Sequence, residues 1–121
     1  MTYQILFYSN AKGNNDIATF LTNLSKSHQK NEIALMKKIT HQLDMLTDLG
    51  PNLGMPQSKL LKGYAYPLYE LRPQPERIFY AVVWDNEILL LHHYTKRTNK
   101  TDQRQITKAL NNLTDWLQRK G

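Results

Sequence analysis

The chain has 121 residues, no cysteine, and 16 Lys and Arg against 10 Asp and Glu, which gives a formal net charge of +6. This length predicts one domain over residues 1–121 and is too short for a cofactor domain joined to a substrate domain. The absence of cysteine excludes disulfides, thiolate metal sites and thiol nucleophiles. The excess of positive charge favours a polyanionic partner, because neutralised phosphates release their counterions.

The N-terminal half is predicted to form one strand and two helices. Tyr3–Ser9 is rich in β-branched and aromatic residues, as strands are, and residues 10–15 form a turn. Asp16 is the expected N-cap of the first helix. The second helix spans Lys30–Leu49 and ends at Gly50-Pro51. Both helices carry an apolar stripe but no group suited to catalysis, and we expect them to cover one face of a sheet.

The C-terminal half is predicted to form three strands and a helix. The expected elements are a loop over Asn52–Gly63, strands over Tyr64–Arg72, Arg77–Trp84 and Glu87–Tyr94, a polar loop over Thr95–Thr101, and a helix over Asp102–Arg119 with Asp102 as its N-cap. This order predicts an α+β domain with a mostly antiparallel four-stranded sheet.

The two predicted hairpins determine which side chains share a face. If Arg72 lies opposite Arg77 and Trp84 opposite Glu87, alternation along each strand assigns every side chain to one of two faces. The face that the helices are expected to cover then carries Leu71, Ile78, Tyr80, Val82, Leu89 and Leu91. The face that points away from the helices carries Glu70, Arg72, Arg77, Phe79, Ala81, His92 and Tyr94.

Glu70, Arg72, Arg77, His92 and Tyr94 are therefore predicted to be neighbours at one end of that second face. Two opposed arginines repel each other unless an anion or Glu70 lies between them. One interpretation is an anion site, and the other is an Arg–Glu–Arg ion network with nothing bound. A different turn at Glu87 would exchange His92 for His93 on this face.

A basic segment follows the third of these strands. It contains five basic residues and one acidic residue, Asp102; the basic ones are Lys96, Arg97, Lys100, Arg104 and Lys108. A phosphate bound there would meet cations together with hydroxyl and amide donors. The alternative is a solvated loop and helix face.

Three motifs in order resemble the phage-derived, HigB-like toxins of the RelE/ParE superfamily. They are L-Y-E-L-R over Leu68–Arg72, R-I-F-Y over Arg77–Tyr80, and L-L-H-H-Y-T-K-R-T-N-K-T over Leu90–Thr101. At the level of motifs, the resemblance covers about half of the chain. His93 stands where these toxins usually have glycine, Arg97 where they have lysine and Asp102 where they have proline.

The resemblance implies the RelE/ParE fold and the toxin of a type II toxin–antitoxin pair that cleaves mRNA, commonly on the ribosome. It also implies that an antitoxin, often a helix-turn-helix DNA-binding protein, neutralises the toxin. The toxin would then contact operator DNA only through this antitoxin. Arg72 and Arg77 match the family's two strand arginines, His92 its histidine, and Lys96, Arg97 and Lys100 its basic loop.

RNA cleavage without a metal or cofactor needs a base, an acid and cations at the phosphate. We assign Arg72, Arg77 and Lys96 to the phosphate charge, His92 to proton transfer, and Tyr94 to stacking or proton donation. The remaining candidates contact RNA or the ribosome: Glu70, which orients an arginine, and His93, Arg97, Lys100, Arg104 and Lys108.

The sequence is also compatible with two other functions. One is a ParE-like toxin that poisons gyrase, and the other is a non-catalytic module that binds RNA or the ribosome. The N-terminus lacks the features of a signal peptide and no segment is apolar enough for a membrane span, so a cytoplasmic location is expected.

Overall fold

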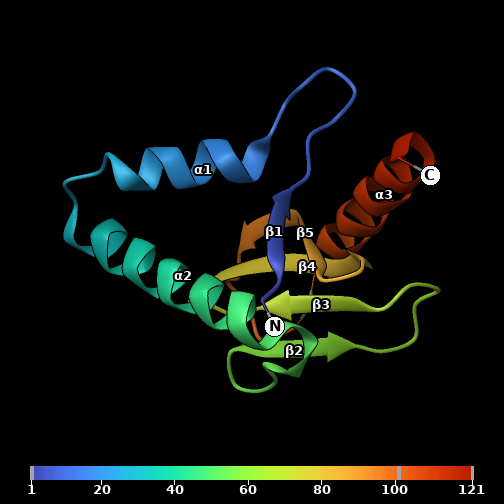
Figure 1. Ribbon diagram of the computed structural model, residues 1–121. Helices are drawn as coiled ribbons and strands as arrows, with labels where there is room; N and C mark the ends of the chain where they lie inside the picture. Colours follow the sequence, from blue (N-terminus) through green and yellow to red (C-terminus); the bar gives the residue numbers. More distant parts are fainter. Residues whose placement is uncertain (1, 101, 121) are drawn as a thin grey trace.

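Three α-helices, one short 3-10 helix and a five-stranded sheet make up the computed structural model, which describes residues 2–100 and 102–120. The elements are β1 (Gln4–Phe7), α1 (Asp16–Ser25), α2 (Lys30–Leu49), a 3-10 helix at Gly50–Asn52, β2 (Ser58–Leu61), β3 (Leu68–Leu71), β4 (Glu76–Trp84), β5 (Glu87–Thr95) and α3 (Gln103–Lys120). The strand order is β1-β5-β4-β3-β2, with β1 parallel to β5 and the other pairs antiparallel (Figure 1). The predicted α+β class is confirmed.

The helices lie close to their predicted bounds. α2 has the predicted ends, and it stops at Gly50 because this residue adopts φ +56°, where the Tyr3 ring lies against its Cα and leaves no room for a Cβ. The cap of α1 was predicted wrongly. Asn15, not Asp16, caps it by accepting a hydrogen bond from the backbone N of Ala18 at 3.0 Å.

The sheet has one strand more than the four predicted. β2 lies within the segment predicted as a loop, and the predicted strand Tyr64–Arg72 is reduced to β3. β2 has only four residues and lies between turns that contain Pro and Gly, so its alternation of polar and apolar residues is too short to be recognised in the sequence. It is a strand because it pairs with β3. Thr101 of the predicted polar loop lies outside the described residues.

Two bulges change the predicted faces of the β4–β5 hairpin. Trp84 pairs with Glu87 and Arg77 with Tyr94, as predicted, but Val82 pairs with Ile88 and Tyr80 with Leu90 between them. β4 has an extra residue at Val83, and β5 has one at Leu91. The second bulge therefore reverses the change of pairing register that the first one causes, and the pairs from Phe79 to Glu76 have the predicted register. Leu89 and Leu91 therefore lie on the face opposite to the predicted one, and Ile88 and Leu90 replace them.

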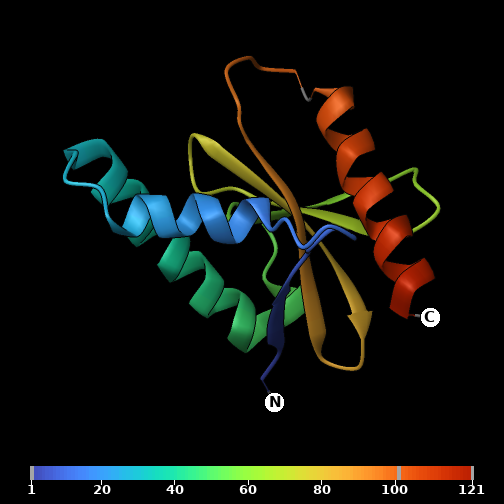
Figure 2. The ribbon, with the colours of Figure 1, turned by 90° about the horizontal axis from the view of Figure 1, so that it is seen from above.

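Both faces of the sheet are covered by helices. α1 and α2 pack on one face against a core that includes Leu71, Ile78 and Tyr80, while α3 packs on the other against Phe79 and Ala81 (Figures 1 and 2). The prediction that the Arg72–His92 face points away from the helices is therefore wrong. The strongly amphipathic α3 needs a partner for its apolar stripe, and only the second face of the sheet offers one.

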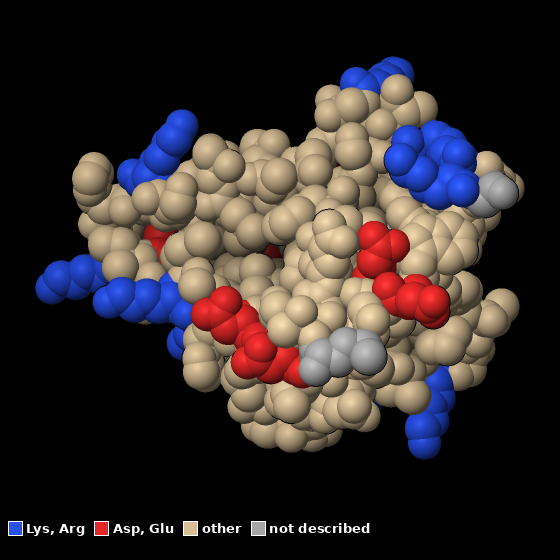
Figure 3. All heavy atoms as spheres, in the orientation of Figure 1, with Lys and Arg blue, Asp and Glu red and all other residues tan. Residues whose placement is uncertain are grey.

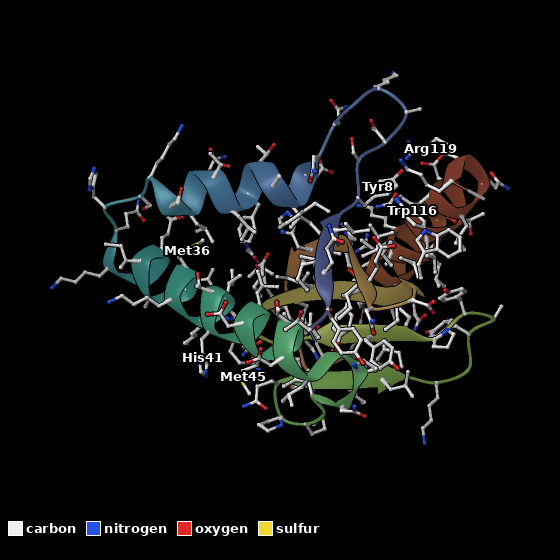
Figure 4. All side chains as sticks on the ribbon, viewed as in Figure 1. Tyr8, Met36, His41, Met45, Trp116 and Arg119 are labelled. Carbon is white, nitrogen blue, oxygen red and sulfur yellow. The ribbon has the colours of Figure 1, made fainter. Side chains whose placement is uncertain are left out.

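A polar contact holds the C-terminal part of α3 against the end of β1. The Tyr8 hydroxyl donates to Asp115 Oδ2 at 2.7 Å, and Arg119 pairs with the same carboxylate at 2.8 Å. Figure 4 shows Tyr8 and Arg119 directed toward one another, beside Trp116. This contact links α3 to the end of β1, while the apolar side chains of α3 hold the helix on the sheet. No helix in the described part of the chain is long and apolar enough to cross a membrane.

Candidate nucleic-acid interface

A buried carboxylate joins the two strand arginines. Glu70 is fully buried on β3, and its Oε1 lies 3.0 Å from Arg72 Nε and 3.7 Å from Arg77 Nε. The β3–β4 ladder ends at the pair Leu71 with Ile78, which is the predicted register, and Arg72 and Arg77 are the next residues beyond that pair. The Arg–Glu–Arg network is thus present, and it reduces the repulsion between the two guanidinium groups.

Three buried polar atoms in this cluster have no hydrogen-bond partner among the described residues. They are Glu70 Oε2, Arg77 Nε and the Tyr94 hydroxyl. Tyr94 lies directly opposite Arg77 in the β4–β5 ladder. Burial, and next the nearby Glu70 charge, raise the pKa of Tyr94 above its usual value, so the phenol stays protonated at neutral pH. The cluster therefore has donor and acceptor capacity that the fold itself leaves unused.

Three aromatic rings lie side by side next to this cluster. The Phe79 ring centroid is 6.3 Å from that of His92 and 5.8 Å from that of Tyr94, with nearly parallel planes. His92 Nε2 lies 2.6 Å from Gln105 Oε1 on α3. Because an amide oxygen only accepts, Nε2 carries the hydrogen and Nδ1 of the neutral ring keeps its lone pair.

Burial lowers the pKa of His92 below its usual value, although the bond to Gln105 partly opposes the shift. The unfolded chain then binds a proton near pH 6.5 that the folded chain takes up only at lower pH. We expect the wild type to lose stability relative to His92→Gln as the pH falls below about 6.5. Urea unfolding of both proteins at neutral and acidic pH tests this, and a pH-independent difference would contradict it.

His93 lies on the opposite face of the sheet. Its Nδ1 is 2.8 Å from Glu76 Oε2, and its ring stacks on Phe20 of α1 with centroids 4.2 Å apart. The same carboxylate accepts a hydrogen bond from the Thr95 hydroxyl at 2.7 Å. Of the two histidines, only His92 therefore shares a face with Arg77 and Tyr94.

A polar pocket of about 300 Å³ opens beside Arg77. It is lined by Gln74, Arg77, Lys96, Arg97, Thr98 and Asn99. Arg77 Nη1 donates to Gln74 Oε1 at 2.9 Å, and the backbone N of Lys96 donates to Pro75 O at 3.0 Å. These bonds hold the β3–β4 turn against the start of the basic loop, at the end of the sheet opposite the N-terminus (Figure 2). The pocket presents cations and amides, which suit an anionic ligand.

The other basic candidates surround this region without entering the pocket. Arg104 is highly exposed and pairs with Asp102 at 3.2 Å, while Lys100 and Lys108 are exposed. Lys108 is close enough to His92 to contribute to the lowering of its pKa. On the side of the molecule that carries the N-terminus, acidic side chains lie near the centre (Figure 3). Positive charge is thus not spread evenly over the surface.

Two site residues were not predicted from sequence. Gln74 lies in the β3–β4 turn, and its side chain reaches the arginine three residues later. Gln105 lies in the first turn of α3 and contacts His92, thirteen residues away. In the sequence, each glutamine is distinguished only by its position next to an element of the predicted site, and that position alone does not identify it as a site residue.

Comparisons with known proteins identify a family and a fold. The family described as "Phage derived protein Gp49-like (DUF891)" matches residues 19–114. A solved structure described as the archaeal RelE–RelB complex from Pyrococcus horikoshii OT3 is similar, with a TM-score of 0.55, 21% identity, and coverage of 78% of this chain and 96% of that chain. No curated protein sequence matches. The structural likeness confirms the RelE-like fold.

Proposed function

Because the chain belongs to the family of phage-derived Gp49-like proteins, we propose that it is the toxin of a type II toxin–antitoxin system. In this proposal it is a HigB-like endoribonuclease that cleaves mRNA on the ribosome in the cytoplasm and needs no metal. The observation that carries the proposal is the polar pocket beside Arg77, which adjoins the face that holds His92 and Tyr94. The RelE-like fold and the net charge of +6 agree with it.

The proposed reaction is attack of a ribose 2′-hydroxyl on the neighbouring phosphate. Arg77 and Lys96 hold the phosphate and its developing negative charge, with Arg72 beside them. His92, neutral at pH 7, removes the 2′-hydroxyl proton through Nδ1, and Tyr94 donates its proton to the departing 5′-oxygen. These two residues are two positions apart on β5, about 7 Å along the strand. Because the Tyr94 hydroxyl is buried, its proton transfer requires RNA binding to open the site beside Arg77. The products are a 2′,3′-cyclic phosphate and a 5′-hydroxyl.

Surrounding residues have supporting roles in this proposal. Glu70 orients the two arginines, and Arg97 extends the pocket. Lys100, Arg104 and Lys108 contact RNA or the ribosome from the surface. His93 contributes through Glu76 to the packing of β5, since it lies on the other face.

The proposed protein partner is a small antitoxin, of the helix-turn-helix DNA-binding kind, which alone contacts operator DNA. The similar archaeal structure is described as a complex of RelE with RelB. That likeness supports a protein partner for this fold without identifying it.

Induction of the gene, followed by mapping of RNA 5′ ends, tests the proposed function. We expect discrete new ends inside translated reading frames, in phase with codons, because cleavage takes place on the ribosome. DNA damage with intact mRNA would instead indicate a gyrase-poisoning toxin. Translation arrest with intact mRNA and intact DNA would indicate a non-catalytic module that binds RNA or the ribosome.

A further inference from the structure

A groove of about 470 Å³ lies between β2 and the start of α3, separate from the pocket beside Arg77. The residues that matter here are Lys59, Leu61, Lys62, Tyr64, Gln103 and Ile106, and we call this site the β2 groove. None of the described residues that line it is acidic. Its volume and its mixture of charged, aromatic and apolar side chains suit one nucleotide or two.

The β2 groove lies beside the arginine cluster because of the strand register. Lys59 pairs with Glu70, so both side chains point to the face that α3 covers. Lys59 is level with Phe79 of β4, two strand spacings or about 10 Å away, and Arg77 lies two residues further along β4, so the backbone of Lys59 is roughly 12 Å from that of Arg77. On its other side, the groove is bordered by Gln103, the first residue of α3. A single strand with one phosphate at Arg77 therefore has a short path to the groove.

The side chains of the β2 groove offer the two contacts that single-stranded RNA uses most. Lys59 and Lys62 are exposed and carry positive charge for phosphates, and the half-buried Tyr64 offers a ring on which a base can stack. The Tyr64 hydroxyl donates to Gln103 Oε1 at 3.4 Å, which ties the ring to α3. The buried Ile106 and the half-buried Leu61 give the groove an apolar floor.

We infer that the β2 groove is a second nucleotide-binding site, which holds the RNA segment next to the one that is cleaved. Its ligand is single-stranded RNA, bound without base specificity through phosphate contacts and stacking. This inference rests on the proposed function, because it assumes that RNA occupies the Arg77 pocket. It adds a contact surface on the opposite side of the arginine cluster from the basic loop.

Fluorescence anisotropy with a labelled 2′-O-methyl oligoribonucleotide tests the inference, since this RNA binds but cannot be cut at its 2′ position. A length of about 12 nucleotides lies within the range that one small domain covers. For the pair Lys59→Ala and Lys62→Ala, we expect the slope of log affinity against log salt to become shallower by about 1.4. The control pair Lys26→Ala and Lys30→Ala removes the same charge at the exposed α1–α2 connection and leaves the slope nearly unchanged.

Tyr64 gives an independent test of stacking. Tyr64→Ala is expected to weaken binding about 5- to 150-fold, whereas Tyr64→Phe keeps the ring and most of the affinity. If the wild type binds the RNA but the groove variants match the control pair, the inference is overturned and the proposed function stands. If the wild type fails to bind the RNA at low salt, the inference is overturned, whereas the proposed function is tested separately by the mapping of RNA 5′ ends.

Discussion

Arg77→Gln is expected to lower RNA cleavage by about 10²–10³-fold, because it removes a fixed donor from the site of developing negative charge. Arg77 is 5% exposed and faces the fully buried Glu70, so folding is also affected. Arg72 still pairs with Glu70 in the variant. We therefore expect a loss of unfolding free energy below the roughly 3–5 kcal/mol that an unpaired buried charge costs.

A second substitution separates folding from catalysis in this variant. Adding Glu70→Gln removes the buried carboxylate that Arg77 balanced. Arg72 then loses its partner as well, but its side chain is partly exposed to water, so the double variant should recover part of the stability but not cleavage. Lys26→Gln removes one positive charge from an exposed position at the α1–α2 connection and should leave both properties nearly unchanged. Unfolding in urea and cleavage rates measured on the same preparations test these results. Wild-type cleavage by folded Arg77→Gln would remove Arg77 from the mechanism.

His92→Gln is expected to lower the rate of the chemical step by about 10²–10⁴-fold while RNA binding persists. The substitution removes proton transfer but leaves the phosphate contacts in place. Single-turnover cleavage measures the chemical step directly.

His93→Gln is the matched control for this histidine. His93 is adjacent in sequence, but its side chain lies on the other face of β5, against Phe20 and Glu76. We expect His93→Gln to change stability while its folded fraction cleaves at the wild-type rate. The reverse pattern, with His92 dispensable and His93 essential, would rule out the proposed base.

The neighbourhood of Glu70, Arg72, Arg77, His92 and Tyr94 was predictable from sequence because both hairpin turns were identified correctly. Once Trp84 is opposite Glu87, alternation along the strands brings Tyr94 opposite Arg77. This inference succeeded only because the bulges at Val83 and Leu91 cancel. Bulges have no reliable signal in a single sequence, so the faces of Leu89 and Leu91 between them were predicted wrongly.

The parts that sequence could not give depend on contacts between distant segments. The parallel pairing of β1 with β5, the strand β2 and the packing of α3 over the arginine face are all of this kind. The apolar stripe of α3 was visible in sequence, but the face of the sheet that it covers was not. The bond from Gln105 to His92 follows from that packing, as does the β2 groove.

The ends of the cleaved RNA test the central claim most directly. Ribosomes programmed with a labelled mRNA, incubated with the purified protein, should yield fragments that end in a 2′,3′-cyclic phosphate and begin with a 5′-hydroxyl. A single 2′-deoxy substitution before the cleaved bond should abolish that cut, since it removes the attacking group. Fragments with a 3′-hydroxyl and a 5′-phosphate, or cleavage that survives the deoxy substitution, would contradict it.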